Sequence, residues 1–278
     1  MSFLESIDKN RLQKILIVTI AALVLALLVC LVVIIIFGIN PPSQKPNDTN
    51  FELNDYVLTD KDVNTGSLLL VDADHPYTPS AELVAGMVGC QSYRNENRGT
   101  TEKGPYYCMN NVQLSPAAIA AAHDLLVAAE KSVKEDDLLV KYAYDGDDGQ
   151  TAEYKTGLLM FLTNYDEEKL PENYAKWIDD NAAKYGFIES FEDAYRYVGE
   201  VHAKYMTEEK VSLADYINFL KKNTHAEKAI TVKLDGVEYA VYYAEGKAGD
   251  TIKVPATAEY TVSGTNEGGV IVTVKNAK

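Results

Sequence analysis

The segment from Ile15 to Ile39 constrains this chain more than any other, because it contains no charged residue. At a rise of about 1.5 Å per residue, a helix of this length crosses the hydrocarbon core of a bilayer, which is about 30 Å thick. The segment also lacks the polar stripe at helical period that a helix packed on a soluble core would show. The sequence therefore predicts one transmembrane helix over residues 15–39.

The residues that flank this span predict its orientation. Lys9, Arg11 and Lys14 precede it, whereas Lys45 is the first cation after it. This bias predicts a cytoplasmic tail over residues 1–14 and an extracytoplasmic remainder. The apolar run is longer than the roughly 7–15 residues of a cleaved signal, so we expect an uncleaved signal anchor and a single-pass protein of the cell membrane.

The charge balance excludes some partners. The chain has 26 Lys and Arg residues against 41 Asp and Glu, a formal net charge of −15, and most of the acidic excess follows the span. Binding to nucleic acid requires cations that neutralise phosphates, so no nucleic-acid partner is expected. Docking on anionic lipid through a basic patch is excluded for the same reason. The membrane is expected as a partner only through the single helix.

Two cysteines, Cys90 and Cys108, flank a polar loop in the predicted extracytoplasmic part. Cysteines of one domain outside the cytoplasm usually pair, so a disulfide is predicted, and the chain-entropy model gives it about 3 kcal/mol of stabilisation. A reactive thiol with a histidine base is the alternative, but no spacing supports it. Cys30, inside the span, is interpreted as a thiol buried in lipid.

After a Pro-rich spacer, the pattern alternates between helical and β segments. The linker and irregular lead-in are expected over residues 40–66. The acidic turn 145–150 does not match the EF-hand spacing, so a solvated turn is expected there. Capping residues and apolar periodicity predict a strand at 67–72, helices at 117–133, 171–185 and 212–222, and a hairpin of 138–144 with 154–163. From residue 227 a period of two around Asp235-Gly236 predicts a small β domain over 227–278.

Three strings occur in a fixed order along the chain: LLLVDADHPY at 68–77, WIDDNAAKYGFI at 177–188 and YRYVGEVHAKYM at 195–206. In type and order they resemble the zinc D-alanyl-D-alanine carboxypeptidases of the VanY-like branch. The resemblance implies an α+β fold, with a carboxypeptidase-like domain over 67–226. It also implies that the tail over 227–278 is a β appendage of the kind that some members carry.

The resemblance implies where a metal site would lie. In the family, zinc is held by the His and Asp of a Ser-x-His-x-x-Gly-x-x-x-Asp-like motif and by the His of Glu-x-Trp-His, whose Glu is the general base. On this chain the three ligand positions fall on Tyr154, Phe161 and Ala194, and no residue takes the role of the base. Phenyl and methyl groups have no lone pair, and a phenol is a poor ligand when its pKa is near 10. We therefore expect no zinc, no other cofactor and no catalytic residue: a degenerate member of the family.

What remains of the family's groove is a candidate cleft for a peptidoglycan stem peptide. The resemblance places Tyr144, Tyr154, Phe161, Tyr195 and Arg196 along it. Aromatic side chains there can present apolar faces and polar tips to a peptide. They can equally fill the space of the missing metal site and close it. The sequence leaves both interpretations open.

Three functions are compatible with these observations as hypotheses. The first is an inactive, carboxypeptidase-like module that binds cell-wall peptide or regulates a partner. The second is an active zinc D,D-carboxypeptidase whose ligands lie elsewhere, such as His75, His123 or His202 with an acid. The third is a structural partner of another membrane protein. Zinc content and release of D-alanine from a stem pentapeptide discriminate between the first two.

Overall fold

The computed structural model describes residues 19–20, 43–97, 105–134, 137–147, 149–165 and 169–275. The predicted transmembrane span lies outside these ranges except for Thr19 and Ile20, which are helical. Among the described residues, no helix combines the length and the apolar character needed to cross a membrane. Residues Met1–Ser43 and Gln44–Lys278 form separate units, and both large sheets belong to the second.

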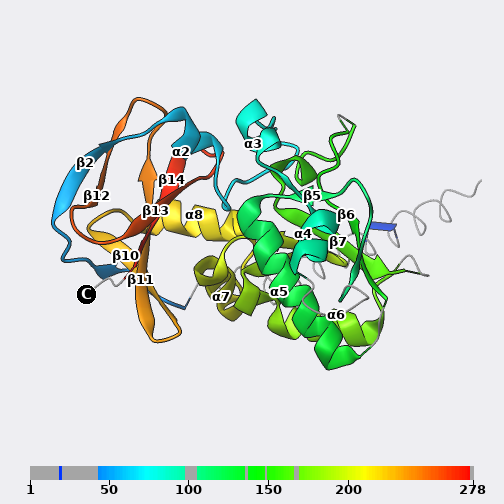
Figure 1. Ribbon diagram of the computed structural model, residues 1–278. Coiled ribbons are helices and arrows are strands. Elements are labelled where there is room, and N and C mark those ends of the chain that lie inside the picture. The colour runs from blue at the N-terminus through cyan, green and yellow to red at the C-terminus, as the bar shows by residue number, and fades with distance from the viewer. Residues whose placement is uncertain are drawn as a thin grey trace, which may run out of the picture. The chain divides into compact units, whose positions relative to one another are not determined.

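The first of two five-stranded sheets is the central sheet, with strand order β4-β6-β7-β9-β8; its strands β6 and β7 are labelled in Figure 1. Its strands are β4 (Tyr107–Cys108), β6 (Leu138–Tyr142), β7 (Leu159–Asn164), β8 (Phe187–Phe191) and β9 (Ala194–Tyr197). All neighbours are antiparallel except β4 and β6, which run parallel. The predicted hairpin is therefore confirmed as the β6–β7 pair, with a one-turn helix η1 (Tyr154–Thr156) before β7.

Two helices cover one face of the central sheet and form the largest core with it. Helix α5 (Pro116–Val133) begins where Ser115 accepts a hydrogen bond from the backbone of Ala118, with proline in the first turn, as predicted. Helix α6 (Glu172–Asn181) continues into η2 (Ala182–Tyr185) and ends at Gly186, whose left-handed φ of 81° favours glycine. Leu125, Leu126 and Ile178 from these helices are fully buried against the strands.

The second sheet, the C-terminal sheet, is antiparallel and has the order β1-β10-β11-β14-β13. Its strands are β1 (Asn47–Asp48), β10 (Lys228–Leu234), β11 (Val237–Glu245), β13 (Tyr260–Gly264) and β14 (Gly269–Lys275). Asp235 and Gly236 join β10 to β11 with φ angles of 48° and 80°, which are those of the predicted tight turn. The period-two pattern is thus confirmed as a sheet.

Both faces of the C-terminal sheet are covered. Helices α7 (Glu200–Glu209) and α8 (Leu213–Asn223) pack on one face, α7 against β10 and α8 against β11; α8 is yellow in Figure 1. Strand β2 (Leu53–Val57), paired with β12 (Thr251–Pro255), and α2 (Asp60–Asn64) contribute to the core on the other face. The expectation of an irregular lead-in over 40–66 was therefore wrong, because its apolar residues complete a sheet formed by the far end of the chain.

The segment 67–72 is not a strand, although its apolar residues are buried as predicted. Its backbone groups bond outside any ladder, since Leu68 N–H donates to Ser263 Oγ at 3.0 Å and Leu70 N–H to the carbonyl of Thr265 at 3.0 Å. Short elements occupy the remaining region near it: α3 (Ala81–Ala85), α4 (Cys90–Asn97), and the pair β3 (Val88–Gly89) with β5 (Gln113–Leu114).

The predicted disulfide is absent: Cys90 and Cys108 are both free thiols. Cys90 is fully buried at the start of α4, and Cys108 packs partly buried against the same core. Burial raises the pKa of both thiols, that of Cys108 to about 12. The two side chains therefore serve as protonated core residues, a role that free cysteine fills readily because it packs as a small apolar side chain.

Candidate functional site

The three positions that the resemblance assigns to zinc ligands meet on one face of the central sheet. Met160 and Leu162 of β7 point into the helix-covered core, so Phe161 between them points to the opposite side, which we call the site face. Phe161 lies directly opposite Ala194 in the β7–β9 register. Tyr154, on η1, packs in one small apolar cluster with Ala194, Leu159 and Phe161.

A fourth position of the family pattern lies beside this cluster. Strands β8 and β9 are joined by only two residues, and Phe191 also lies opposite Ala194. Phe191 is three residues before Ala194, which is the spacing of Glu to His in Glu-x-Trp-His. Sequence reasoning missed this residue because it expected a longer segment here; the short β8–β9 turn is what aligns Phe191 with the position of the base.

The side chains gathered there do not fit a zinc ion. They supply two phenyl rings, one methyl group and the phenol of Tyr154. Burial raises the pKa of Tyr154 to about 12, and the neighbouring Glu153 and Tyr142 act in the same direction, so the phenolate that a metal would need is disfavoured. Within the described ranges, no group of three or more His, Cys, Asp or Glu side chains is placed to hold a metal ion. We derive no chemical step through zinc.

The histidines considered as alternative ligands are dispersed. Each is held by side chains of its own surroundings: His75 by Asp72 and Glu267, His123 by Tyr106, and His202 by Tyr216 and Thr273. His202 is buried between α7, α8 and β14, and this burial lowers its pKa to about 4. It therefore remains a neutral core residue at physiological pH.

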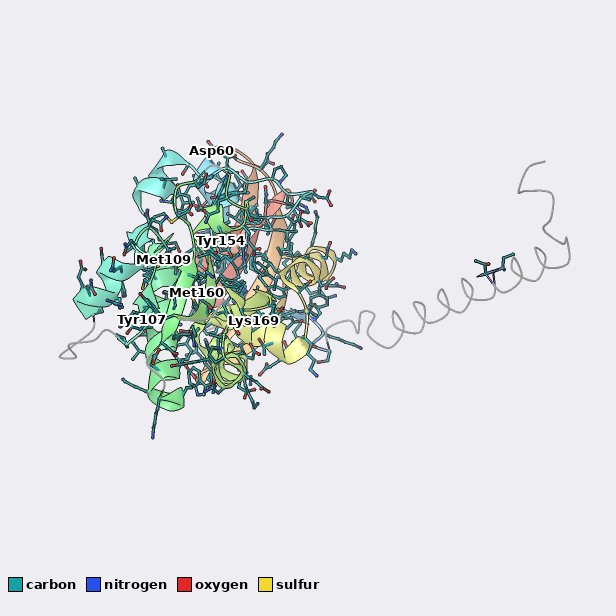
Figure 2. The ribbon with its side chains drawn as sticks, turned by 90° about the vertical axis from the view of Figure 1, so that its right-hand side faces the viewer. Asp60, Tyr107, Met109, Tyr154, Met160 and Lys169 are labelled. Carbon is teal, nitrogen blue, oxygen red and sulfur yellow. The ribbon has the colours of Figure 1, made fainter. Side chains whose placement is uncertain are left out.

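Phe161 of the apolar cluster and two exposed rings beside it, Tyr142 and Phe191, form what we call the aromatic patch. The rings of Tyr142 and Phe161 lie 5.6 Å apart, and 48% of Tyr142 and 46% of Phe191 is exposed. A second group, Tyr107, Met109 and Tyr165, lies near the β4 edge (Tyr107, Met109 and Tyr154 are labelled in Figure 2). Neighbouring apolar rings that are partly exposed, like those of the aromatic patch on β6, β7 and β8, are typical of a binding surface.

Arg196 follows the cluster by two residues along β9 and is buried. Its Nη1 donates to Glu153 Oε1 at 3.0 Å, and its Nη2 donates to the carbonyl of Leu69 at 2.5 Å. Ser190 Oγ also donates to Glu153. Burial lowers the pKa of Arg196 while Glu153 opposes that change. The guanidinium therefore links the central sheet to the segment around Leu69 as a charged structural contact.

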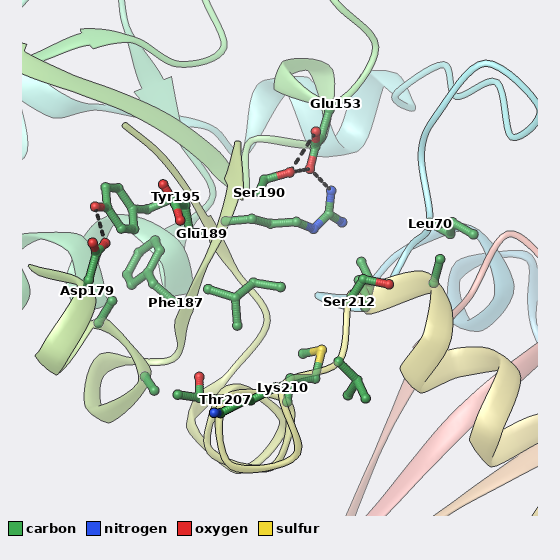
Figure 3. Close-up of a pocket in the computed structure, with 18 of the residues that line it drawn as sticks. Leu70, Glu153, Asp179, Phe187, Glu189, Ser190, Tyr195, Thr207, Lys210 and Ser212 are labelled. Carbon is green, nitrogen blue, oxygen red and sulfur yellow. Dashed lines mark hydrogen bonds and ion pairs between the residues drawn. The ribbon is translucent and has the colours of Figure 1, made fainter. Parts of the chain in front are cut away.

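A pocket of about 690 Å³ lies next to this contact (Figure 3). Figure 3 shows Glu153 with Ser190 on one side of it and Asp179 with Tyr195 on another; the Tyr195 hydroxyl donates to Asp179 at 2.7 Å. Burial, reinforced by Asp179, raises the pKa of Tyr195 far above its usual range. Burial, followed by Asp179 and Asp193, also raises the pKa of Glu189 in the pocket wall.

The five predicted cleft residues do not share one surface. Tyr195 and Arg196 line the pocket, whereas Tyr144, Tyr154 and Phe161 do not. Tyr195 belongs to the helix-covered core, on the opposite side of β9 from Ala194. Tyr144 is buried, and its carbonyl accepts from the backbone of Gln113 at 2.7 Å. The ring-lined part of the candidate site is therefore reduced to the aromatic patch with Tyr154 beneath it.

Comparison with known proteins confirms the resemblance. No family model matches the chain. Over 120 residues the chain is 39% identical to a D-alanyl-D-alanine carboxypeptidase of Enterococcus faecium, and the match covers 38% of each protein, so it spans well under half of that relative. The structure is similar to that of the vancomycin-resistance D,D-dipeptidase VanXYg in complex with a D-Ala-D-Ala phosphinate analogue.

That similarity has a TM-score of 0.61 at 20% identity and covers 81% of this chain and 99% of the dipeptidase. The mixed helix and sheet fold is thus similar to that of this D,D-dipeptidase. The chain is similar in sequence to a D-alanyl-D-alanine carboxypeptidase over part of its length, and similar in fold over most of it.

Proposed function

We propose that the chain is a membrane-anchored, extracytoplasmic, carboxypeptidase-like protein that has lost zinc hydrolase chemistry and acts as a cell-wall peptide-binding or regulatory module. One observation carries this proposal: Tyr154, Phe161 and Ala194 meet in one apolar cluster. A zinc hydrolase needs three ligands and an open position for water. Without the metal, nothing lowers the pKa of that water towards 7.

The anchored, extracytoplasmic location rests on the uncharged run Ile15–Ile39 and on the cations that precede it. A cell-wall ligand requires this location, because stem peptides lie outside the membrane. The proposal therefore places residues 40–278 beyond the outer surface of the membrane. Protease accessibility of these residues in intact cells tests the orientation directly.

The ligand we propose is a stem peptide that ends in D-Ala-D-Ala. The similar carboxypeptidase and the phosphinate complex of the similar dipeptidase both carry D-Ala-D-Ala in their names. On this chain the aromatic patch replaces the reactive centre with rings that are partly exposed. Such rings contact methyl groups and peptide faces without cleaving them.

A second candidate, an active zinc D,D-carboxypeptidase, draws support from the name of the similar protein. It requires ligands other than Tyr154, Phe161 and Ala194. A third, a structural partner of another membrane protein, would use the same exposed rings. Zinc content, release of D-alanine and binding of a stem peptide together separate all three.

The full-length chain, purified in detergent, is analysed for zinc and then incubated with a pentapeptide ending in D-Ala-D-Ala. We expect far less than one zinc per chain and no release of D-alanine. Stoichiometric zinc together with release that a chelator abolishes would overturn the proposal in favour of the enzyme.

Binding of the same pentapeptide is measured by calorimetry on the wild type and on Phe191→Ser. Loss of one ring contact, worth about 1 kcal/mol, should weaken binding about fivefold. Tyr165→Ser is the matched control, because Tyr165 is also an exposed ring, at 62%, but lies outside the aromatic patch. Equal affinity in all three proteins would mean that the aromatic patch does not contact the pentapeptide. Absence of binding in the wild type would favour the structural partner.

A further inference from the structure

The segment 66–77, here called the strap, separates two pockets. Leu70, Val71 and Asp72 line the pocket of Figure 3. Ser67, Leu69, Pro76 and Tyr77 line a second pocket, also of about 690 Å³, whose other walls include Pro116 at the start of α5 and Tyr197 of β9. A movement of the strap therefore changes a wall of both pockets at once.

The first half of the strap is firmly held. Leu68 and Leu70 donate backbone hydrogen bonds to Ser263 and Thr265, and the Leu69 carbonyl accepts from Arg196. The side chains of this half are buried. None of these contacts titrates near neutral pH, because they join backbone groups, a hydroxyl and a guanidinium. This half is expected to stay in place.

The second half, residues 72–77, is mostly exposed and forms a turn around Asp72, whose Oδ1 accepts from the backbone of Asp74 and His75 at 2.9 Å. The His75 side chain of this half contacts the turn between β13 and β14. Asn266 of that turn also donates to the carbonyl of Pro76 at 3.3 Å. At the end of the strap, the partly buried ring of Tyr77 lies near Arg196. The exposed residues between Asp72 and Pro76 are therefore attached through polar contacts.

The His75 ring lies between two carboxylates. Its Nδ1 is 2.7 Å from Asp72 Oδ1, and its Nε2 is 3.3 Å from Glu267 Oε1. An ionised carboxylate only accepts hydrogen bonds, so both contacts are made at once only when both ring nitrogens carry a proton. The neutral ring has one N–H and must set a lone pair against the other carboxylate.

We propose that His75 is a pH-sensitive latch that fastens the outer half of the strap to the β13–β14 turn when the ring is protonated and releases it when the ring is neutral. Histidine is the side chain whose charge ordinarily changes between pH 5 and 8, so a pair of contacts that needs both ring protons depends on pH. Since the strap forms a wall of both pockets, the latch sets how readily either of them widens.

The charged groups around the ring favour the latched state at mildly acidic pH. Asp72 and Glu267 face the two nitrogens, Asp74 precedes His75 in the strap, and Lys221 of α8 faces Glu267 from 3.7 Å and partly offsets its charge. The hydrogen bond from His75 holds the pKa of Asp72 below its usual value, which favours the ionised carboxylate that accepts this bond. The latch therefore holds in mildly acidic solution and loosens as the pH rises and a ring proton is lost.

Hydrogen exchange with mass spectrometry on the full-length chain in detergent tests the latch. Protection factors of peptides covering 71–77, corrected for intrinsic exchange rates, are compared at pH 5.5 and pH 7.5. We expect protection to fall about two- to fivefold at the higher pH, the scale of a partly exposed ion pair. In His75→Gln this pH dependence should disappear because the ring is gone. In Glu267→Gln it should also disappear, because the glutamine amide can accept from Nε2–H or donate to the Nε2 lone pair, so that the neutral ring keeps the contact.

His225→Gln is the matched control, since His225 is exposed and its ring accepts from the backbone of Glu227. This variant should keep the wild-type pH dependence. Peptides covering 67–70 serve as an internal reference and should not change with pH. Equal protection at the two pH values in the wild type, or a pH dependence that survives in His75→Gln, would overturn the latch.

Discussion

The two sheets of this molecule place apolar side chains differently. In the C-terminal sheet six of the seven residues of β14 are buried, because helices cover one face and the β2–β12 pair the other. In the central sheet one face is buried under α5 and α6, while the site face carries rings that are about half exposed. The first arrangement is that of a structural core, and the second is that of a surface available to a ligand.

The comparison also separates the candidate site from the structural cores. On the site face, Phe161 and Phe191 both lie opposite Ala194 in the strand register. The C-terminal sheet has a buried core on each of its faces. Side chains of the site face can therefore differ from those of an enzyme without affecting the cores that maintain the fold.

The largest effect is expected from rebuilding the metal site. The variant Tyr154→His, Phe161→Asp, Ala194→His places three zinc donors where the apolar cluster now lies. We expect about one tightly bound zinc ion per chain, measured by elemental analysis, and a higher melting temperature with zinc than with a chelator.

Phe161→Asp alone is the control for this variant, because one carboxylate cannot hold the ion. Circular dichroism establishes that both variants fold. A folded triple variant that takes up no zinc would contradict the inferred convergence of the three positions.

Truncation of one side chain in each sheet should give unequal losses of stability. Ile271→Ala removes a buried side chain of β14 and should cost about 2–5 kcal/mol in the free energy of unfolding. Phe191→Ala on the site face should cost less than about 1 kcal/mol, since the ring is 46% exposed. Urea unfolding of the two variants measures both losses in the free energy of unfolding. Losses of similar size would mean that Phe191 is packed as a core residue and that the aromatic patch is not a surface.

A smaller, pH-dependent effect is expected from His202. Its pKa is lowered by burial from 6.5 to about 4, so the folded state prefers the neutral ring. The stabilising contribution of neutral His202 to the free energy of unfolding is fully present above pH 6.5. It is lost as the pH falls to about 4, a change of about 3 kcal/mol. Unfolding curves at pH 7 and pH 4.5 should show this loss in the wild type and a smaller one in His202→Gln.

The sign of this effect is opposite to that of the His75 latch, which tightens as the pH falls. His75→Gln should therefore leave the loss of stability between pH 7 and pH 4.5 in place. If His202→Gln loses as much free energy of unfolding as the wild type between pH 7 and pH 4.5, the loss at acidic pH is due to carboxylates and not to His202.

Local signals were sufficient for most helices and for the hairpin turns. Ser115, Ser212 and Gly186 act at helix ends as their residue types predict, and Asp235-Gly236 forms the expected turn. The strands β1 and β2 were missed, because their partners β10 and β12 lie near the other end of the chain and no local pattern reports that pairing. The run at 67–72 was misread, because burial alone does not separate a strand from an extended segment.

For the site, the resemblance assigned Tyr154, Phe161 and Ala194 to the ligand positions, and the β7–β9 register and η1 bring these residues into one cluster. Their assignment to ligand positions stays a prediction. The predicted disulfide between Cys90 and Cys108 was wrong. The prediction rested on the general tendency of extracytoplasmic cysteines to pair, and it did not consider that a free thiol can pack in the core as a small apolar side chain. Tyr195 was assigned to the cleft, although alternation along β9 turns it towards α6, where it binds Asp179.

Strand β1 joins β10, and the hydroxyl of Thr49 just after it donates to the carbonyl of Ala226, 177 residues later. A ribosome must therefore make nearly the whole protein before its earliest strands find their neighbours. Until then the apolar side chains of β2 and α2, such as Tyr56 and Val63, remain exposed to solvent. Nascent chains can then aggregate or bind chaperones. A premature stop ahead of β10 would thus leave the start of the domain unfinished as well as its end.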